Sequence, residues 1–532
     1  MMAKCRGRVV FDFLFERLPI WALRFILFLV VVVAPFVHYG YAKTYLVDAQ
    51  PLLLPGVLIL GLALPLVTLM ITRKYPAITG KFFVPLVLGG GVLLLCVQMF
   101  LVKGGLFETS WDVASVAIVH DRLNPDSLSY LQGYLSNNPN NTMINVIFSV
   151  VAAVGSALGI TTYMALVLGG CLCVTISIVA CTFAARHVFG ERIALAFDVL
   201  ASLYLGLNAW IFVPYTDTYG MLCPALVLFS ITCIRDKRLA AVLVGLLSAL
   251  GYAIKPTAIF TLLACCILAL PRLVASAHAW IQKEKLHNKA QSVLHSQLFQ
   301  VLLCGCMAFV IGWVACSGIT TYREQQIGAD TTKAKSVAHF LMMGANPESM
   351  GGFNGDDVNY TNSFTDPKER TAANIKEWLR RIGEMGPVGT AKLATRKTLT
   401  NFSDGTFAWE HEGRFYRHQL GNNSAIKAWY GIGEKGATIN SGLSYELVCQ
   451  MLWLVVLIGC ACVSRNGASS TEKIMRLALL MLGLFLMIFE ARARYLFLFA
   501  PYFVLLGVVG WFRIEKALCS FMRERLGIGE RG

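Results

Sequence analysis

Apolar stretches long enough to cross a lipid bilayer recur along most of this sequence. An α-helix needs about 20 predominantly apolar residues to span ~30 Å of hydrocarbon. Windows of that kind cover residues 21–40, 52–71, 84–101, 164–184, 193–212, 219–234, 239–254, 258–273, 298–319, 445–463, 477–489 and 495–512. With 56% apolar and 14% charged residues, the chain holds more hydrophobic sequence than one soluble core can bury. We therefore expect an all-α polytopic membrane protein with about 12–13 transmembrane helices.

The net charge of +15 comes from Lys and Arg residues that collect in short loops between these windows. Basic loops mark the cytoplasmic side of membrane proteins, so this charge does not predict nucleic-acid binding. The loops carry Arg6 and Arg8; Arg73, Lys74 and Lys81; Arg186, His187 and Arg192; Arg235, Lys237 and Arg238; Lys283, Lys285 and Lys289; and Arg513, Arg523 and Arg525. With these loops inside, two long polar segments face out. The expected parts are N-terminal transmembrane helices (1–103), a first outer loop (104–141), a central bundle (142–319), an outer loop or small domain (320–444), and C-terminal helices with a basic tail (445–532).

Charge and hydropathy disagree over residues 142–184. Hydropathy indicates two spans joined at 159–162, which would place Arg186 and Arg192 outside. We expect residues 143–158 to be short, tilted or partly re-entrant, because every other basic loop then falls inside. The opposite choice would invert the faces of everything before the second outer segment.

The sixteen cysteines lie in or beside apolar segments, and none falls in the two outer segments. A disulfide framework is therefore not expected. Close pairs such as Cys171/Cys173 have no second pair in a polar context, which favours helix packing over metal binding. In the second outer segment Asp356 and Asp357 lack further ligands. We expect no cofactor, and the sequence does not support a divalent metal.

The first outer segment carries a candidate catalytic acid, Asp112. The residues Val113, Val116, Ala117 and Val119 are spaced for a short helix along the membrane interface. Asp112 would lie at the N-terminal end of that helix, just above the bilayer. Asp is also a favoured helix cap, and the sequence leaves the two roles equally open.

The second outer segment predicts one helix clearly. At 366–369 the sequence places Asp at the N-cap, Pro at N1 and Glu at N3. Ile375, Trp378, Leu379 and Ile382 then follow on one face. We expect this segment to form a small, partly helical domain.

Three short outer connections carry ionisable residues at the membrane edge, where burial costs several kcal/mol unless the charge is paired or functional. The first holds Tyr215 and Asp217, and the second holds Lys255. An ion pair of Asp217 with Lys255 and a role for Lys255 in phosphate binding are both open. The third connection holds Arg492 and Arg494 against the positive-inside trend, and arginines at an outer rim suit bidentate phosphate binding.

In this order, the parts resemble the GT-C superfamily of integral membrane glycosyltransferases, particularly bacterial relatives of protein O-mannosyltransferases and of the aminoarabinose transferase acting on lipid A. The resembling motifs are Trp111-Asp112, the Tyr134 loop ending in Pro139-Asn140-Asn141, Tyr215-Thr-Asp217, Lys255-Pro-Thr257, Met342-Met-Gly344, Gly351-Gly352, and Glu490-Ala-Arg-Ala-Arg-Tyr495. The series spreads over nearly the whole chain. It implies a GT-C-like bundle with interfacial helices in the first outer loop.

The resemblance assigns the role of general base to Asp112, which would remove the proton of the acceptor hydroxyl. The sugar would arrive on a polyprenyl phosphate, with Arg492, Arg494 and Lys255 stabilising the leaving phosphate. Attack opposite the phosphate would invert the anomeric centre. The residues expected to contact substrates are Tyr134, Asn140, Asn141, Tyr215, Asp217, Glu490 and Tyr495.

The chain departs from the best-known members in two places. It has two extra spans before the first outer loop, and it has Asp112-Val113 where many members have an Asp-Glu pair. The second difference leaves the acceptor type open. We expect a multi-pass cell-membrane enzyme with an extracytoplasmic active site and a cell-wall glycan, surface glycopolymer or protein as acceptor.

The alternatives are a flippase or transporter for lipid-linked oligosaccharides, a polysaccharide polymerase or ligase, and a scaffold protein. A transporter has charged midplane residues and often internal repeats. This chain shows no repeat between its halves, and transport does not require its long second outer segment.

Overall fold

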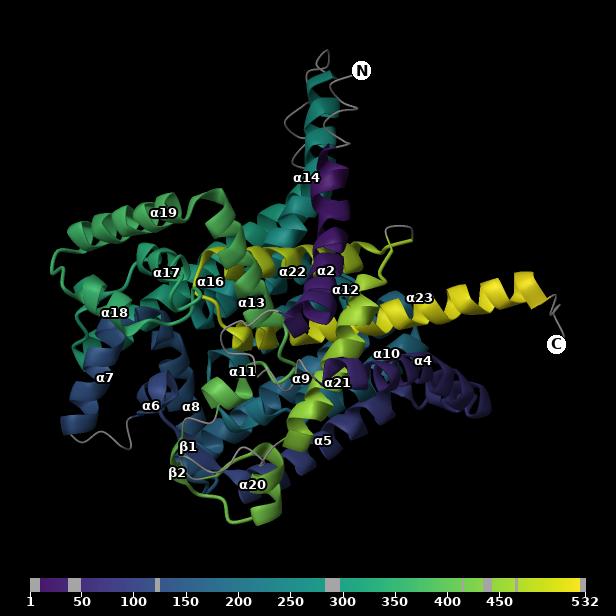
Figure 1. Cartoon of the computed structure of the whole chain (residues 1–532), viewed down its shortest axis with the longest axis horizontal. Helices are drawn as coiled ribbons and strands as arrows, with labels where there is room; N and C mark the ends of the chain where they lie inside the picture. Colours follow the sequence, from purple (N-terminus) through teal and green to yellow (C-terminus); the bar gives the residue numbers. More distant parts are fainter. Residues whose placement is uncertain are drawn as a thin grey trace.

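The computed structural model describes residues 10–36, 49–119, 125–282, 297–413, 416–433, 443–464 and 467–526 (Figure 1). Within these ranges the regular secondary structure is helical apart from one two-stranded sheet, so the predicted all-α polytopic membrane fold is confirmed. The helices are α2 (Leu18–Phe28), α4 (Gln50–Lys74), α5 (Phe83–Gly105), α6 (Trp111–Val116), α7 (Pro125–Asn137), α8 (Thr142–Ala157), α9 (Thr162–Phe189), α10 (Glu191–Ala201), α11 (Thr216–Gly220), α12 (Leu222–Cys233), α13 (Lys237–Ile254), α14 (Phe260–Gln282), α16 (Gln297–Ile327), α17 (Val337–Gly344), α18 (Gly355–Asn362), α19 (Pro367–Phe402), α20 (Ser424–Tyr430), α21 (Leu443–Ala461), α22 (Ser470–Ile488) and α23 (Ala500–Leu526). The strands are β1 (Phe107–Thr109) and β2 (Tyr416–Gln419).

Ten helical stretches in the described ranges are long and apolar enough to cross a membrane. They are Val10–Phe36, Gln50–Lys74, Phe83–Gly105, Pro139–Ala157, Thr162–Phe189, Thr216–Cys233, Lys237–Ile254, Phe299–Ile327, Leu443–Ala461 and Ala493–Arg525. The expected number was higher because the windows at 193–212, 258–273 and 477–489 fall outside this set. The first of them, for example, turns π-helical at Ser202–Gly206 and is then interrupted at Asn208, which caps a short 3-10 helix.

The surface that a bilayer would cover is visible on α5. Leu88, Val92, Leu93 and Phe100 are all at least half exposed although they are apolar. An exposed apolar band of this kind marks a membrane contact rather than a water-facing surface.

Helices α5 and α9 run antiparallel and define two ends of the bundle. Near the start of α5, the guanidinium of Arg186 lies 4.3 Å from the ring centroid of Phe83. Just past the end of α5, the backbone N–H of Thr109 donates to the hydroxyl of Tyr163 at 3.3 Å. We call these the Arg186 end and the Gly105 end.

Helix α8 begins and ends at the Gly105 end. In its first turn, Asn145 donates to the backbone carbonyls of Val116 and Ile118 at 2.9 and 2.8 Å. Beyond its last turn, Tyr163 at the start of α9 contacts Thr109. The segment is long enough to span a membrane, yet it returns the chain to the same end. These contacts agree with the tilted or re-entrant character expected for residues 143–158.

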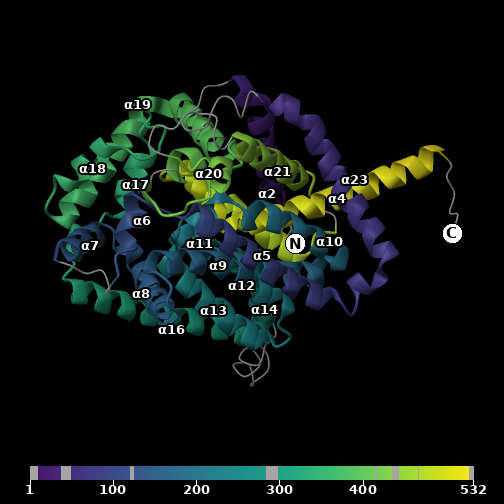
Figure 2. The ribbon, with the colours of Figure 1, turned by 90° about the horizontal axis from the view of Figure 1, so that it is seen from below.

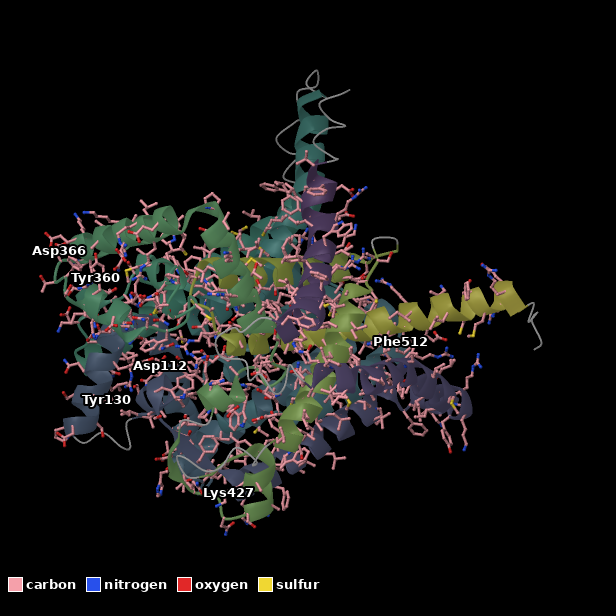
Figure 3. All side chains as sticks on the ribbon, in the orientation of Figure 1. Asp112, Tyr130, Tyr360, Asp366, Lys427 and Phe512 are labelled. Atoms are coloured by element: carbon pink, nitrogen blue, oxygen red, sulfur yellow. The ribbon has the colours of Figure 1, made fainter. Side chains whose placement is uncertain are left out.

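Both polar segments gather at the Gly105 end. Helices α7, α17 and α18 lie together on the left of Figures 1 and 2, whereas α23 extends to the right toward the C-terminus. Figure 3 likewise shows Asp112 and Tyr130 on the left and Phe512 of α23 far from them. Strand β1 pairs antiparallel with β2, with Phe107 opposite Gln419, which ties the second polar segment to the first.

The helix predicted from its capping residues is confirmed as α19. The Asp366 side chain accepts from the N–H groups of Lys368 and Glu369 at 2.7 and 2.9 Å. The face expected to be apolar is only partly covered, because Ile375 and Leu379 are 42% and 57% exposed.

We expect opposite effects from two glycine substitutions in the successive helices α21 and α22. A Cβ at Gly459 would collide with the backbone of Gly507, where α21 and α23 approach closely, whereas a Cβ at Gly483 would meet nothing within 4 Å. Gly459→Ala should destabilise the protein by about 1–3 kcal/mol, and Gly483→Ala should be neutral or stabilise it by up to about 1 kcal/mol. Thermal unfolding in detergent measures both, and equal effects would contradict this packing.

Candidate active site

Asp112 does not cap a helix. The N-cap position of α6 is Ser110, and Asp112 is the second residue of the helix. Its Oδ2 accepts a hydrogen bond from the Tyr215 hydroxyl at 3.1 Å. The Tyr134 hydroxyl is a second hydrogen-bonding partner of this carboxylate. Asp112 is half-buried, so the carboxylate remains partly open to a ligand.

A short hydrogen-bonded chain fixes Tyr215 against Asp112. The amide of Asn141 donates to the Tyr134 hydroxyl at 2.6 Å and to the Tyr215 hydroxyl at 3.2 Å. Burial raises the pKa of both tyrosines, and the nearby Asp112 charge raises it further, so both remain proton donors at neutral pH. Asn140 is exposed and reaches this chain only through Asn141, at 3.4 Å.

Lys255 and Asp217 form a buried ion pair, one of the two roles left open by the sequence. The Nζ of Lys255 also lies 3.8 Å from the ring centroid of Tyr495. Burial lowers the pKa of Lys255, and the Asp217 carboxylate offsets part of that effect. Lys255 is thus already compensated within the protein.

The two predicted phosphate-binding arginines are engaged by carboxylates rather than standing free at a rim. Arg492 donates through Nε to Glu490 at 2.8 Å and lies 3.2 Å from Glu412. The Nε of Arg494 lies 3.1 Å from Glu412 and 3.7 Å from Asp217. Glu412 therefore bridges both arginines.

The Nε–H of Arg494 nevertheless lacks a well-aligned acceptor. Arg494 is 5% exposed, and this N–H forms no hydrogen bond of good geometry with a residue of the described ranges, although the two carboxylates lie near it. Its guanidinium instead stacks 4.2 Å from the ring centroid of Trp111 and 5.1 Å from that of Tyr215. Trp111 adopts a positive φ of 54°. Strained backbone conformations of this kind cluster at functional sites. A buried guanidinium N–H without a well-aligned acceptor favours a bound anion.

Sequence reasoning missed Glu412, because its place depends on a loop without a local signature. The Asp404 carboxylate accepts from the N–H groups of Thr406 and Ala408 and folds this loop back. A π-helical turn, Trp409–Gly413, then presents Glu412 to the arginines. Burial alone would raise the pKa of Glu412, but Arg492 and Arg494 outweigh burial and hold it below its usual value.

Two lysines of the second polar segment were also missed. Lys335 lies in the electrostatic range of Asp112 and Glu490. Lys397 is fully buried, and its Nζ donates to the carbonyls of Gly344 and Phe489 at 2.6 Å each. Lys397 thereby fixes the residue that precedes Glu490. The sequence around each lysine does not predict that it lies near the site.

Of the two adjacent aspartates considered for a metal, Asp357 is held in a structural ion pair, whereas Asp356 is exposed. Arg381 pairs with Asp357 at 2.6 Å, and Asn346 donates to the same carboxylate at 3.0 Å. In the part of the chain that the structure describes, no group of three or more His, Cys, Asp and Glu residues is placed to hold a metal ion.

A family described as "Conserved hypothetical integral membrane protein" matches residues 20–514. The chain belongs to this family. No curated protein matches the sequence. Among solved structures, this member of the family is similar to the archaeal oligosaccharyltransferase AglB from Archaeoglobus fulgidus, in complex with an inhibitory peptide and a dolichol-phosphate, at 11% identity and a TM-score of 0.36. That match covers 85% of this chain and 53% of AglB, so the chain spans about half the length of that protein.

In this family member, Glu412→Gln should destabilise the fold by about 3 kcal/mol, because two buried arginines would lose their shared counter-ion. The control is Glu384→Gln, which removes an exposed ion pair with Arg380 and should cost below about 1 kcal/mol. Thermal unfolding at pH 7 compares the two. An equal loss in both variants would show that Glu412 does not hold the arginines.

The stability of the wild type should rise with pH above neutrality because of Lys397. Burial lowers the pKa of Lys397 to about 7, and Glu490 only partly offsets this. Between pH ~7 and the usual lysine pKa of about 10.4 the unfolded chain binds more protons, so the free energy of unfolding increases with pH. Lys397→Met should remove this rise, whereas Lys392→Met, at an exposed position of the same helix, should keep it. Identical pH profiles of the unfolding midpoint in both variants would contradict the assignment.

Proposed function

We propose that this integral membrane protein is a glycosyltransferase that transfers a sugar from a polyprenyl-phosphate donor to an acceptor hydroxyl. The observation that carries the proposal is the juxtaposition of the half-buried Asp112 carboxylate and Arg494, whose buried Nε–H has no well-aligned acceptor among the described residues. Tyr215 touches both, by a hydrogen bond to Asp112 and a ring contact with Arg494. A proton acceptor and an anion-binding group thus face the same space.

The chemistry follows from these two groups. The acceptor oxygen attacks the anomeric carbon as Asp112 takes its proton, because a neutral hydroxyl is a poor nucleophile. The bond from the anomeric carbon to the phosphate oxygen breaks, and its electron pair leaves with the polyprenyl phosphate. Arg494 and Arg492 stabilise the negative charge that gathers on this leaving group, and Lys255, which is paired with Asp217, adds to the positive charge around them. Attack from the side opposite the phosphate inverts the anomeric centre.

The membrane location supports a lipid-linked donor. The cations lie where apolar helices end, so a polyprenyl tail can remain in the bilayer while its phosphate reaches the site. Lys81 and Arg186 mark the opposite end of the bundle, which the positive-inside rule assigns to the cytoplasm. The site then opens on the extracytoplasmic side of the cell membrane, toward a surface or cell-wall glycan or a protein hydroxyl.

Before the donor binds, Glu412 is the shared counter-ion of the two arginines. It compensates Arg492 and Arg494, which would otherwise be buried charges without counter-ions. A donor phosphate would then share the arginines with Glu412 and use their remaining N–H groups.

The test is sugar transfer by the purified protein from a panel of polyprenyl-phosphate sugars. Asp112→Asn should lower the transfer rate by about 10²–10⁴-fold, because it removes the base. Arg494→Gln should lower it by about 10²-fold, because it removes the stabilisation of the leaving phosphate. Asp126→Asn, at an exposed position of α7 in the same polar segment, should transfer at the wild-type rate.

Unfolding midpoints of all variants show whether a lost rate reflects a lost fold. Transfer at the wild-type rate by a folded Asp112→Asn variant would show that Asp112 is not the base. No consumption of any donor, together with passage of lipid-linked oligosaccharide across liposomes containing the protein, would replace the transferase by a flippase.

A further inference from the structure

Lys335 is held in the same wall of the site as Asp112. It lies between a 3-10 helix, Thr331–Lys333, and α17, and it is half-buried. Its backbone N–H donates to the Asn137 carbonyl at 3.1 Å, and its Nζ donates to the Asn138 side chain at 3.5 Å. Both partners lie near the end of the first polar segment, where α7 ends. Lys335 therefore joins the second polar segment to the one that carries Asp112.

Lys335 differs from the other cations around the site because it lacks a counter-ion. Lys255, Arg492 and Arg494 each contact at least one carboxylate. Lys335 forms no ion pair with any residue of the described ranges, and its ammonium makes one long hydrogen bond there, to a neutral amide.

This arrangement leaves most of the binding capacity of the Lys335 ammonium unused. The group has three N–H donors and a full charge. Burial lowers the pKa of Lys335, and the more distant Asp112 and Glu490 only partly offset this. A partly buried charge of this kind is costly unless a ligand compensates it.

We infer that Lys335 binds an anionic group, a carboxylate or a phosphate, on the acceptor. The choice of acceptor rather than donor rests on the proposed function. The acceptor hydroxyl has to reach Asp112, in the electrostatic range of Lys335. The donor phosphate is already assigned to Arg492 and Arg494. The site is thus selective for acceptors that carry a negative charge near the reacting hydroxyl.

Binding of matched small probes tests this without turnover. The probes are phenyl β-D-glucoside, which is neutral, phenyl β-D-glucuronide, which carries a carboxylate, and phenyl β-D-glucoside 6-phosphate. Calorimetry measures their affinity for the full-length protein in detergent. We expect at least one anionic probe to bind the wild type about tenfold more tightly than the neutral probe, the size of one charge-assisted hydrogen bond. The stronger of the two then identifies the anion.

The matched variants are Lys335→Gln and Lys333→Gln. Lys333 is two residues away but exposed, and within the described ranges its ion-pair partner is Asp330, at 3.7 Å. Lys335→Gln should abolish the preference for the anionic probe, whereas Lys333→Gln should keep it. Absence of a preference in the wild type, or its survival in Lys335→Gln, would overturn the inference. If sugar transfer fails but the Lys335-dependent preference for the anionic probe is present, the proposed function is wrong and the anion site remains supported.

Discussion

The buried charges at the Gly105 end constrain how the segments that carry them pack together. A charge removed from water at the edge of a membrane is costly unless an opposite charge accompanies it. Here three cations meet three carboxylates that come from distant parts of the chain, namely Lys255, Arg492 and Arg494 with Asp217, Glu412 and Glu490. No single helix can satisfy this set. The compensation therefore fixes the starts of α11 and of the last span relative to the loop that carries Glu412.

The proposed base depends on the same cluster. Arg494 supports the rings of Trp111 and Tyr215, and the Tyr215 hydroxyl holds Asp112. Movement of the arginine would thus displace the base without touching it directly. The site is one connected network, in which the groups that would stabilise a leaving phosphate also orient the group that would take the proton. This arrangement suits a reaction in which both events occur together.

The second polar segment completes the site rather than merely covering it. It supplies Glu412 to the arginines, Lys397 to the carbonyl that precedes Glu490, and Lys335 to the neighbourhood of Asp112. Pairing of β1 with β2 ties this segment directly to the end of α5. These contacts join it to the first polar segment and to the last connection.

The sequence by itself determined the features that depend on local physics. Long apolar windows required membrane helices, and the Asp366 cap required a helix start at Pro367. Ionisable residues at helix ends, such as Asp217 and Arg494, had to be paired or functional, and the structure brings them together. Only the tertiary structure decided which charges meet. Glu412 and Lys335 resemble ordinary loop residues along the chain, because their surroundings are built from segments tens to hundreds of residues away.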